Sequence, residues 1–254
     1  MKTAVITGGA GGLGQALAQD LLRDGWHVAI LDLPSAALDQ MARQTAITAL
    51  PCDLTDEQAL RAAAAVIINA RPSVDLVIYN AALTQIGPFE TQDMAAHRKL
   101  FEVNYFAAVS CAALFLQALR QSKGTHLAVS SVAGFAPLTH RTAYAASKHA
   151  LEGFFKSLRS EERAQGVRVH IAAPSFVGTN IGRAEEQAGG LSRPGSATDT
   201  IDAMTPEAAS GEILRGMAKG VDMIPVGRVA RMAWWLNGLA PRVYQRAMER
   251  KISD

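Results

Sequence analysis

The 254-residue sequence lacks the features that would direct it to an oxidising compartment, a bilayer or a nucleic acid. It has two cysteines, Cys52 and Cys111, in no CxxC or metal-ligand spacing, which excludes a disulfide scaffold and fits a reducing compartment. Its 25 basic and 23 acidic side chains give a net charge of +2, too balanced for a nucleic-acid partner. No apolar run suits a signal peptide or a membrane span, so we expect a cytoplasmic protein.

What the chain does have is a hydrophobic fraction of 49% and a regular alternation of strand and helix patterns. The short apolar runs that predict strands lie at 4–6, 27–31, 47–50, 75–79, 126–130 and 167–172, with a further one expected near 221–226. Each is apolar almost throughout, as in parallel strands covered on both faces. Helical patterns separate the runs, for example over 13–23, where Leu13, Leu17 and Leu21 share one face. The sequence therefore predicts an α/β fold, a single-domain, Rossmann-like, doubly wound parallel sheet of about seven strands with helices on both faces.

Two segments stand apart from this alternation. Residues 182–205, rich in Gly, Ser, Ala and Glu, show no stable period, which indicates either a disordered stretch or a functional lid inside a domain over 1–227. The tail, 228–254, has six basic and two acidic residues, hence a charge of +4, so the rest of the chain carries −2. Its apolar residues fall at helical spacing on one expected face: Val229, Met232, Ala233, Leu236 and Ala240, widened by Trp234 and Trp235. Such a helix has four candidate roles: peripheral membrane contact, closure of the substrate pocket, subunit contact, or ordinary packing against the domain, and packing or subunit contact is favoured.

A glycine cluster, TGGAGGLG over 7–14, lies between the first expected strand and the first expected helix. Glycines let a dinucleotide pyrophosphate approach the backbone, and the free N–H groups and dipole of a helix N-terminus attract it. A tight strand-to-helix turn without a ligand is the alternative interpretation. A P-loop is excluded because no Lys-Ser or Lys-Thr follows the glycines. The candidate cofactor-binding residues of this loop are Gly8, Gly11, Gly12, Leu13 and Gly14.

Asp32 ends the second expected strand, 18 residues after Gly14. A carboxylate at this position accepts hydrogen bonds from the adenosine ribose hydroxyls of NAD. It would repel the 2′-phosphate of NADP, and neither Leu33 nor Gly11 supplies a compensating cation. We therefore favour NAD as the cofactor, with Asp32 and Leu33 at its ribose. The alternative is that Asp32 only caps the following turn.

Tyr144 and Lys148 are spaced i, i+4 in a helical pattern, so they lie on one helix face about 6 Å apart along the axis. A nearby ammonium favours the phenolate and lowers the pKa of a tyrosine from its usual value of about 10. A phenol tuned in this way can pass a proton to or from a substrate oxygen near neutral pH. The pair alone is weak evidence, because any helix can carry it by chance.

In combination, these motifs make the chain resemble the short-chain dehydrogenase/reductase family over residues 2 to about 226. The matching elements occur in order along the chain: the glycine loop, Asp32, Asp53-Leu54, Asn80-Ala81, Asn104, Ser130-Ser131, Tyr144/Lys148 and Pro174 to Thr179. The sequence departs from the family pattern at two places. Tyr79-Asn80-Ala81-Ala82 stands for Asn-Asn-Ala-Gly, and Pro174-Ser175 stands for Pro-Gly.

The resemblance implies a role for each matching residue. Tyr144 would be the general acid/base, Lys148 would hold the nicotinamide ribose, Ser131 would hydrogen-bond the substrate oxygen, and Asn104 would keep a water in a proton relay. The further cofactor contacts that it implies are Asp53 and Leu54 at the adenine, Asn80 and Ala81 beside the cofactor, and Pro174, Val177 and Thr179 near the nicotinamide. Ser130 is expected to be a strand-end residue whose hydroxyl bonds to the backbone. None of the six histidines has a metal-ligand spacing, so we expect no metal.

The leading hypothesis is an NAD-dependent enzyme that interconverts a secondary alcohol and a ketone. The alternative from another class is a non-catalytic dinucleotide-binding sensor, which would have little need for Ser131, Tyr144 and Lys148 together. An apolar small-molecule substrate, such as a steroid-, terpenoid- or acyl-type alcohol, is suggested by Phe135, Ala136, Leu138 and Phe176. The family resemblance also implies a homodimer or homotetramer, assembled through two long helices over 98–120 and 142–165.

Overall fold

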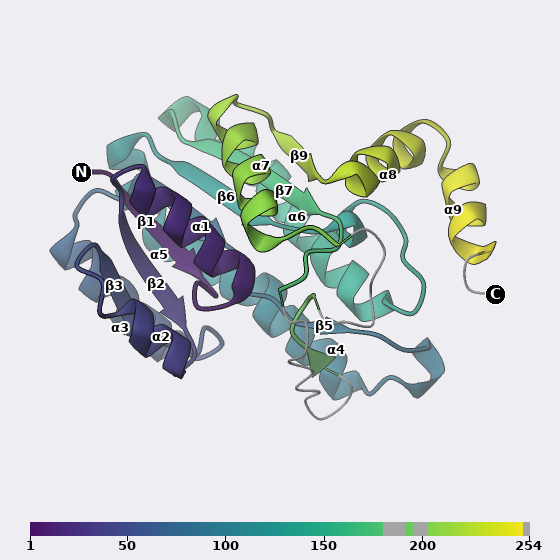
Figure 1. The fold of residues 1–254 in the computed structure, drawn as a ribbon, viewed down its shortest axis with the longest axis horizontal. Helices are drawn as coiled ribbons and strands as arrows, with labels where there is room; N and C mark the ends of the chain where they lie inside the picture. The colour runs from purple at the N-terminus through teal and green to yellow at the C-terminus, as the bar shows by residue number, and fades with distance from the viewer. Residues whose placement is uncertain (180–190, 196–202, 251–254) are drawn as a thin grey trace.

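The computed structural model describes residues 1–179, 191–195 and 203–250 and places a seven-stranded sheet at the centre of the molecule (Figure 1). All neighbouring strands are parallel, in the order β3-β2-β1-β4-β6-β7-β9. The strands of this sheet are β1 (Thr3–Thr7), β2 (His27–Asp32), β3 (Ile47–Pro51), β4 (Leu76–Tyr79), β6 (Thr125–Val129), β7 (Arg168–Pro174) and β9 (Met223–Val226). The predicted fold class is therefore confirmed, including the strand expected near 221–226.

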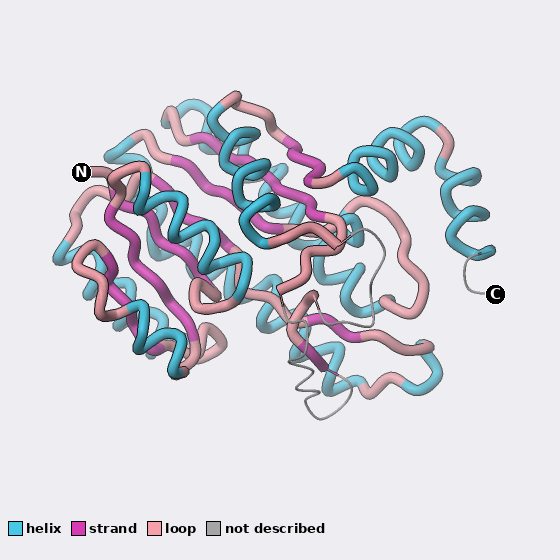
Figure 2. The backbone as a smooth tube through the Cα atoms, viewed as in Figure 1, coloured by secondary structure: helices cyan, strands magenta, loops and turns pink. Residues whose placement is uncertain are grey.

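Helices cover both faces of the sheet, with the strands running between them as the magenta layer of Figure 2. The face covered by α1, α2 and α7 lies against Ile6 and Ile30, whereas the face covered by α3, α5 and α6 lies against Val5 and Leu31. Successive strand residues thus enter different cores, which explains why each strand is apolar throughout. These helices are α1 (Gly12–Arg23), α2 (Ala36–Met41), α3 (Glu57–Ala70), α5 (Ala107–Ser122), α6 (Thr142–Glu162) and α7 (Pro206–Ala218).

Two helix starts follow the side-chain signals in the sequence. Asp56 caps α3, because its carboxylate accepts hydrogen bonds from Gln58 N at 2.9 Å and Ala59 N at 3.1 Å. Thr205 caps α7 by accepting from Ala208 N at 3.2 Å, and Pro206 occupies the first helical position.

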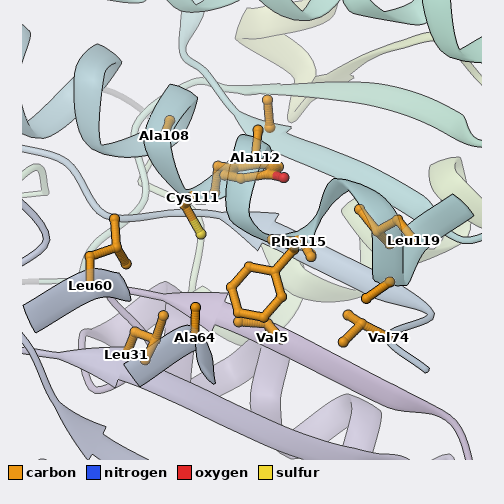
Figure 3. Close-up of a cluster of buried hydrophobic side chains, with 14 of the residues drawn as sticks. Val5, Leu31, Leu60, Ala64, Val74, Ala108, Cys111, Ala112, Phe115 and Leu119 are labelled. Carbon is orange, nitrogen blue, oxygen red and sulfur yellow. The ribbon is translucent and has the colours of Figure 1, made fainter. Parts of the chain in front are cut away.

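Helix α4 (Met94–Phe101), a π-helical turn (Glu102–Phe106) and α5 form one continuous helical run. Among the described residues this run alone has the length and apolar composition of a membrane span. Cys111 and Phe115 on it are fully buried, and Figure 3 shows them pointing toward Val5 and Ala64. The run therefore packs as a core helix of this domain.

The topology fixes where a ligand can bind. From β1 the chain builds outward through β2 and β3, then returns to place β4 on the other side of β1. Ligands of doubly wound sheets bind at such a switch point, beyond the carboxyl ends of the strands. The glycine loop after β1 and Asn80 after β4 both lie there.

The segments outside the alternation are only partly described. The expected lid over 182–205 falls largely on 180–190 and 196–202, outside the described residues. Within it, β8 (Leu191–Ser192) pairs antiparallel with β5 (Thr84–Gln85), a small second sheet that sequence analysis missed.

The tail contains two helices, α8 (Arg228–Leu239) and α9 (Pro241–Arg250), which extend away from the sheet at the C-terminal end (Figure 1). Ala240, before Pro241, has φ −143° and ψ 65°, as expected where proline disfavours the helical conformation of the preceding residue. The prediction that Met232 and Ala233 share one buried apolar face of the tail was wrong for Met232. Helix α8 buries Ala230 and Ala233, whereas Met232 is 64% exposed.

Candidate active site

The glycine loop turns the chain from β1 into α1 with the backbone exposed. Gly8 has φ +65°, and a Cβ at Gly14 would lie 2.3 Å from the carbonyl oxygen of Gly8, so both positions require glycine. Gly11 is the N-cap of α1 and has no side chain to accept from the first N–H groups, which leaves the positive end of the helix open. A Cβ at Gly11 would meet nothing closer than 3.5 Å. The loop therefore has room and free N–H groups for an anionic pyrophosphate.

Asp32 at the end of β2 holds this loop. Its Oδ2 accepts a hydrogen bond from Ala10 N at 2.8 Å, and its Oδ1 accepts from Leu33 N at 2.8 Å. A carboxylate oxygen has a second lone pair, so Asp32 can still accept from ribose hydroxyls. The bond from Leu33 N is also what the turn-capping alternative expects, while the helix that follows is capped separately by Ser35, which accepts from Leu38 N at 3.2 Å.

Asn80 joins the ends of β1 and β4. Its Nδ2 donates to Gly8 O at 2.9 Å and to Thr7 O at 3.2 Å. Thr7 returns the contact, because its hydroxyl oxygen accepts from Asn80 N at 3.0 Å and from Ala81 N at 3.2 Å. Thr7 was not among the predicted site residues, although it precedes the glycines directly.

Asp53 lies beyond the end of β3, where its Oδ1 accepts from Thr55 N at 2.9 Å and from Thr55 Oγ1 at 2.8 Å. These bonds, led by the one from the Thr55 backbone, hold the pKa of Asp53 below its usual value, and the nearby Lys99 acts in the same direction. Asp53 is therefore ionised at neutral pH. It lines the same cavity as its neighbour Leu54.

Tyr144 and Lys148 lie one turn apart on α6, with Lys148 Nζ 5.9 Å from the centroid of the Tyr144 ring. Lys148 is 2% exposed, and its ammonium donates to Val129 O at 2.9 Å, at the end of β6. Burial lowers the pKa of Lys148 to about 8, against the opposing charge of Glu152. Lys148 is thus mostly cationic at pH 7 but close to titration.

Ser131 begins a 3₁₀ turn, Val132–Gly134, directly after β6. Its hydroxyl oxygen accepts from Ala133 N at 3.2 Å, which leaves its own O–H to donate toward the cavity.

The expectation for Ser130 was wrong. Its hydroxyl donates to the carboxylate of Glu152 at 2.8 Å instead of to the backbone. Glu152 is 1% exposed and also accepts from Lys156 Nζ at 2.7 Å, so its charge is paired inside the protein. A Cβ at Gly134 would lie 2.2 Å from Ser130 Oγ and 2.3 Å from Glu152 Oε1. Two hydrogen bonds therefore join the end of β6, just before Ser131, to α6: Lys148 Nζ donates to Val129 O, and the Ser130 hydroxyl donates to Glu152.

Asn104 lies in the π-helical turn and is 1% exposed. Its amide accepts from Leu83 N at 2.8 Å and donates to Leu83 O and Ser147 Oγ, both at 2.9 Å. The side chain therefore fixes the loop after β4 against α6 and does not line the cavity.

The loop after β7 closes another side of the site. Val177 and Thr179 follow Pro174, and the Thr179 hydroxyl donates to Pro194 O at 2.7 Å. The Ser175 side chain, which replaces the glycine of the family pattern, donates to Val226 O at 3.3 Å.

One cavity of about 560 Å³ collects most of these residues, a size typical of small-molecule and cofactor sites. It is lined by all the predicted site residues except Gly14 and Asn104. Leu138 and Phe176 line it as expected. Phe135 and Ala136 do not; Phe135 packs edge-on against Trp234 of α8, with ring centroids 5.0 Å apart.

The tail contributes to the lining as well, through Val229 of α8 and Tyr244 and Met248 of α9. Pocket closure was one of the roles left open for this segment. Within 1–179, 191–195 and 203–250, no group of three or more His, Cys, Asp or Glu side chains could hold a metal ion.

The fold is thus a doubly wound parallel sheet whose cavity joins an open glycine loop to the side chains of Ser131, Tyr144 and Lys148. The family model of the short chain dehydrogenases matches residues 2–189. The chain therefore belongs to the short-chain dehydrogenase/reductase family and is an oxidoreductase of that family.

Known relatives agree with this assignment. Dehydrogenase/reductase SDR family member 7B of Rattus norvegicus is 30% identical over 96% of this chain and 79% of its own length. A short-chain dehydrogenase structure from Streptomyces avermitilis covers 100% of this chain and 98% of its own, with TM-score 0.82 and 24% identity.

Two further structures carry cofactors. The Burkholderia cenocepacia short chain dehydrogenase in complex with NADP has TM-score 0.84 and 22% identity, with 98% of this chain and 99% of its own covered. The Burkholderia phymatum short chain dehydrogenase/reductase in complex with NAD has TM-score 0.76 and 21% identity, with 88% of each chain covered. Proteins of this fold thus bind either dinucleotide.

Proposed function

We propose that the protein is an NAD-dependent dehydrogenase that interconverts a secondary alcohol and a ketone. The observation that carries the proposal is that Ser131, Tyr144 and Lys148 line the same cavity as the glycine loop and Asp32. A binding protein of this fold would need the dinucleotide residues alone. The residues fit a dinucleotide, because backbone N–H groups at the N-terminus of α1 are accessible to a pyrophosphate.

The proposed roles of the chain's residues follow from their contacts. Tyr144 removes the hydroxyl proton of an alcohol, or donates one to a ketone. The cation of Lys148, held by Val129 O, stabilises the Tyr144 phenolate and binds the nicotinamide ribose. Ser131 donates its O–H to the substrate oxygen. NAD, when bound, supplies the hydride acceptor, and the protein contributes position and electrostatics.

Asn104 holds Leu83 and Ser147 through its side chain, so we propose that it serves the proton path indirectly, by fixing the π-helical turn where a water would bind.

We propose NAD over NADP. Asp32 is the only charged lining residue at the end of β2, and Leu33 beside it is 45% exposed and uncharged. A 2′-phosphate would meet a carboxylate there without a cation.

We propose an apolar substrate. Beyond Tyr144, the cavity wall includes Leu83, Val103, Leu138 and Phe176. Val229 and Met248 of the tail helices extend this wall, so that a compound with a hydrocarbon body would be enclosed.

We further propose that the protein works in the cytoplasm as a homodimer or homotetramer. Cys52 and Cys111 are free thiols, as expected in a reducing compartment, and burial raises the pKa of Cys52 to about 11 and raises that of Cys111 too, so both are protonated at neutral pH. Phe106, 48% exposed at the start of α5, lies against Tyr105, whose ring contacts Phe154 of α6. This aromatic surface supports assembly through α5 and α6, and light scattering on the purified protein measures the oligomeric state directly.

The test of the proposed reaction is reduced-nicotinamide absorbance, recorded with NAD and a panel of secondary alcohols from small aliphatic to steroid and long-chain compounds. We expect oxidation of the apolar members. Tight NAD binding without turnover of any alcohol or ketone would point to the sensor instead.

A further inference from the structure

The outer side of the two tail helices carries an unusual concentration of exposed apolar side chains. Met232, Trp235 and Leu239 of α8 are 64%, 66% and 80% exposed, and Val243 of α9 is 54% exposed. In a helix of 3.6 residues per turn, Met232, Trp235 and Leu239 fall on one side, opposite the buried Ala230 and Ala233. We name these four side chains the apolar ridge.

Arginines flank the apolar ridge. Arg228 and Arg231 of α8 and Arg242 and Arg246 of α9 are exposed, while Glu249 is the sole acidic residue in the two helices. Arg231 pairs with Glu212 at 3.0 Å, so three of these arginines have no carboxylate within ion-pair distance among the described residues. The segment 228–254 carries +4, whereas the remainder of the chain carries −2.

We propose that the apolar ridge and its arginines form a docking surface for an anionic phospholipid membrane. Trp, Leu, Met and Val on one side of a helix with arginine beside them match the chemistry of a lipid interface, in which apolar side chains enter the acyl boundary and cations meet the headgroups. The cytoplasmic leaflet is the anionic one, which fits the proposed location. The charge asymmetry orients the protein, because the net negative remainder is repelled from the surface to which the tail is attracted.

Other side chains of the same two helices connect this surface to the cavity. Val229, Tyr244 and Met248 line the cavity, so the two helices that carry the docking surface also form part of the cavity wall. A docked protein therefore holds its cavity next to the lipid, where apolar alcohols and ketones concentrate. This consequence rests on the proposed function; the docking itself does not.

Vesicle co-sedimentation of the full chain tests the docking. The probes are vesicles of equal parts phosphatidylcholine and phosphatidylserine, with pure phosphatidylcholine as the comparison. We expect binding to the mixed vesicles, weaker binding to the neutral ones, and loss of binding at about 1 M salt, where the Debye length falls to about 3 Å. Wild-type protein that stays in the supernatant with mixed vesicles overturns the proposal.

Two variant pairs assign the effect to this surface. W235S/L239S should lower affinity for the mixed vesicles at least ten-fold, whereas F89S, which removes an aromatic side chain of matched exposure (65%), should not. R242Q/R246Q should lower it about five-fold per arginine, equivalent to about 1 kcal/mol each. The control R43Q/R61Q removes two exposed arginines outside the tail and should leave the affinity unchanged. Equal binding by W235S/L239S and wild type overturns the proposal.

Two controls separate docking from misfolding and from self-association. The variants' melting temperatures and their NAD-dependent turnover in vesicle-free buffer report folding and the proposed reaction independently of docking. Light scattering reports whether the apolar ridge joins two copies of the chain. One combined result would assign the apolar ridge to self-association and overturn the membrane proposal. In that result, wild type does not bind vesicles, and W235S/L239S forms a smaller oligomer than wild type.

Discussion

Asp32 stabilises the glycine loop and, by our proposal, also selects the cofactor, and the two effects can be measured separately. It would accept bonds from the adenosine ribose, and it already accepts from Ala10 N and Leu33 N, both at 2.8 Å. Charge-assisted bonds of this kind contribute about 1.5–3 kcal/mol each. With NADP, the bond from the 2′-hydroxyl is lost and the carboxylate faces a phosphate. We therefore expect wild type to prefer NAD by at least about 100-fold in kcat/KM, at about 1.4 kcal/mol per decade.

The variant series follows from the same contacts. D32A/L33R removes the repulsion and supplies a bidentate phosphate partner from an exposed position, so the preference should narrow or invert. D32A also leaves the buried Ala10 N–H without its acceptor, which should lower the free energy of unfolding by about 1–3 kcal/mol. D32N keeps an acceptor oxygen and should retain more of that stability.

The assays are kcat/KM for NAD and NADP and urea unfolding of each variant. Equal use of both cofactors by wild type, or an unchanged ratio in D32A/L33R, would show that Asp32 does not select the cofactor.

Three further predictions concern buried titratable side chains: Lys148, Glu152 and His126. K148M places an apolar side chain at this buried position. It should weaken NAD binding and move the pH optimum of alcohol oxidation upward, because the Tyr144 phenolate loses its cation. An unchanged pH profile would contradict this coupling. E152Q should lower the pKa of Lys148 below about 8 and shift the alkaline limb of activity to lower pH, with KM for NAD nearly unchanged; the exposed carboxylate variant E161Q is the control and should shift nothing. His126 is buried and its pKa is lowered to about 4 by burial, so the unfolded chain takes up its proton first. Stability should therefore fall by up to about 3 kcal/mol as the pH drops from about 6.5 to 4, and urea unfolding of H126N should show a flatter pH dependence; an equally steep dependence in H126N would assign the fall to a different group.

The elements that sequence patterns predicted are those whose signals are local. Each strand of the main sheet is a run of apolar residues, so its signal lies within the strand itself. The glycine loop was predictable because its residues are adjacent and serve one backbone turn. The end of α8 could also have been predicted from Pro241, which a continuous apolar periodicity over the tail does not take into account.

The features that were missed depend on contacts between distant parts of the chain. Strands β5 and β8 have two residues each, and their pairing is set by tertiary structure, not by propensity. Ser130 and Glu152 are ordinary residues by type, and their contact exists because α6 packs behind the end of β6. The exposure of Met232 likewise follows from which side of α8 meets the turn at Val132 and Ala136.

The central claim is that Tyr144 moves the hydroxyl proton while the hydride goes directly to the nicotinamide. The most direct test uses the best alcohol of the panel, deuterated at its carbinol carbon, with mass spectrometry of the reduced cofactor. We expect complete deuterium transfer by wild type and a rate at least about 100-fold lower for Y144F, with NAD affinity retained, because the ring keeps its shape but loses the proton-carrying group. Deuterium that appears in solvent, or a Y144F rate near that of wild type, would contradict the account.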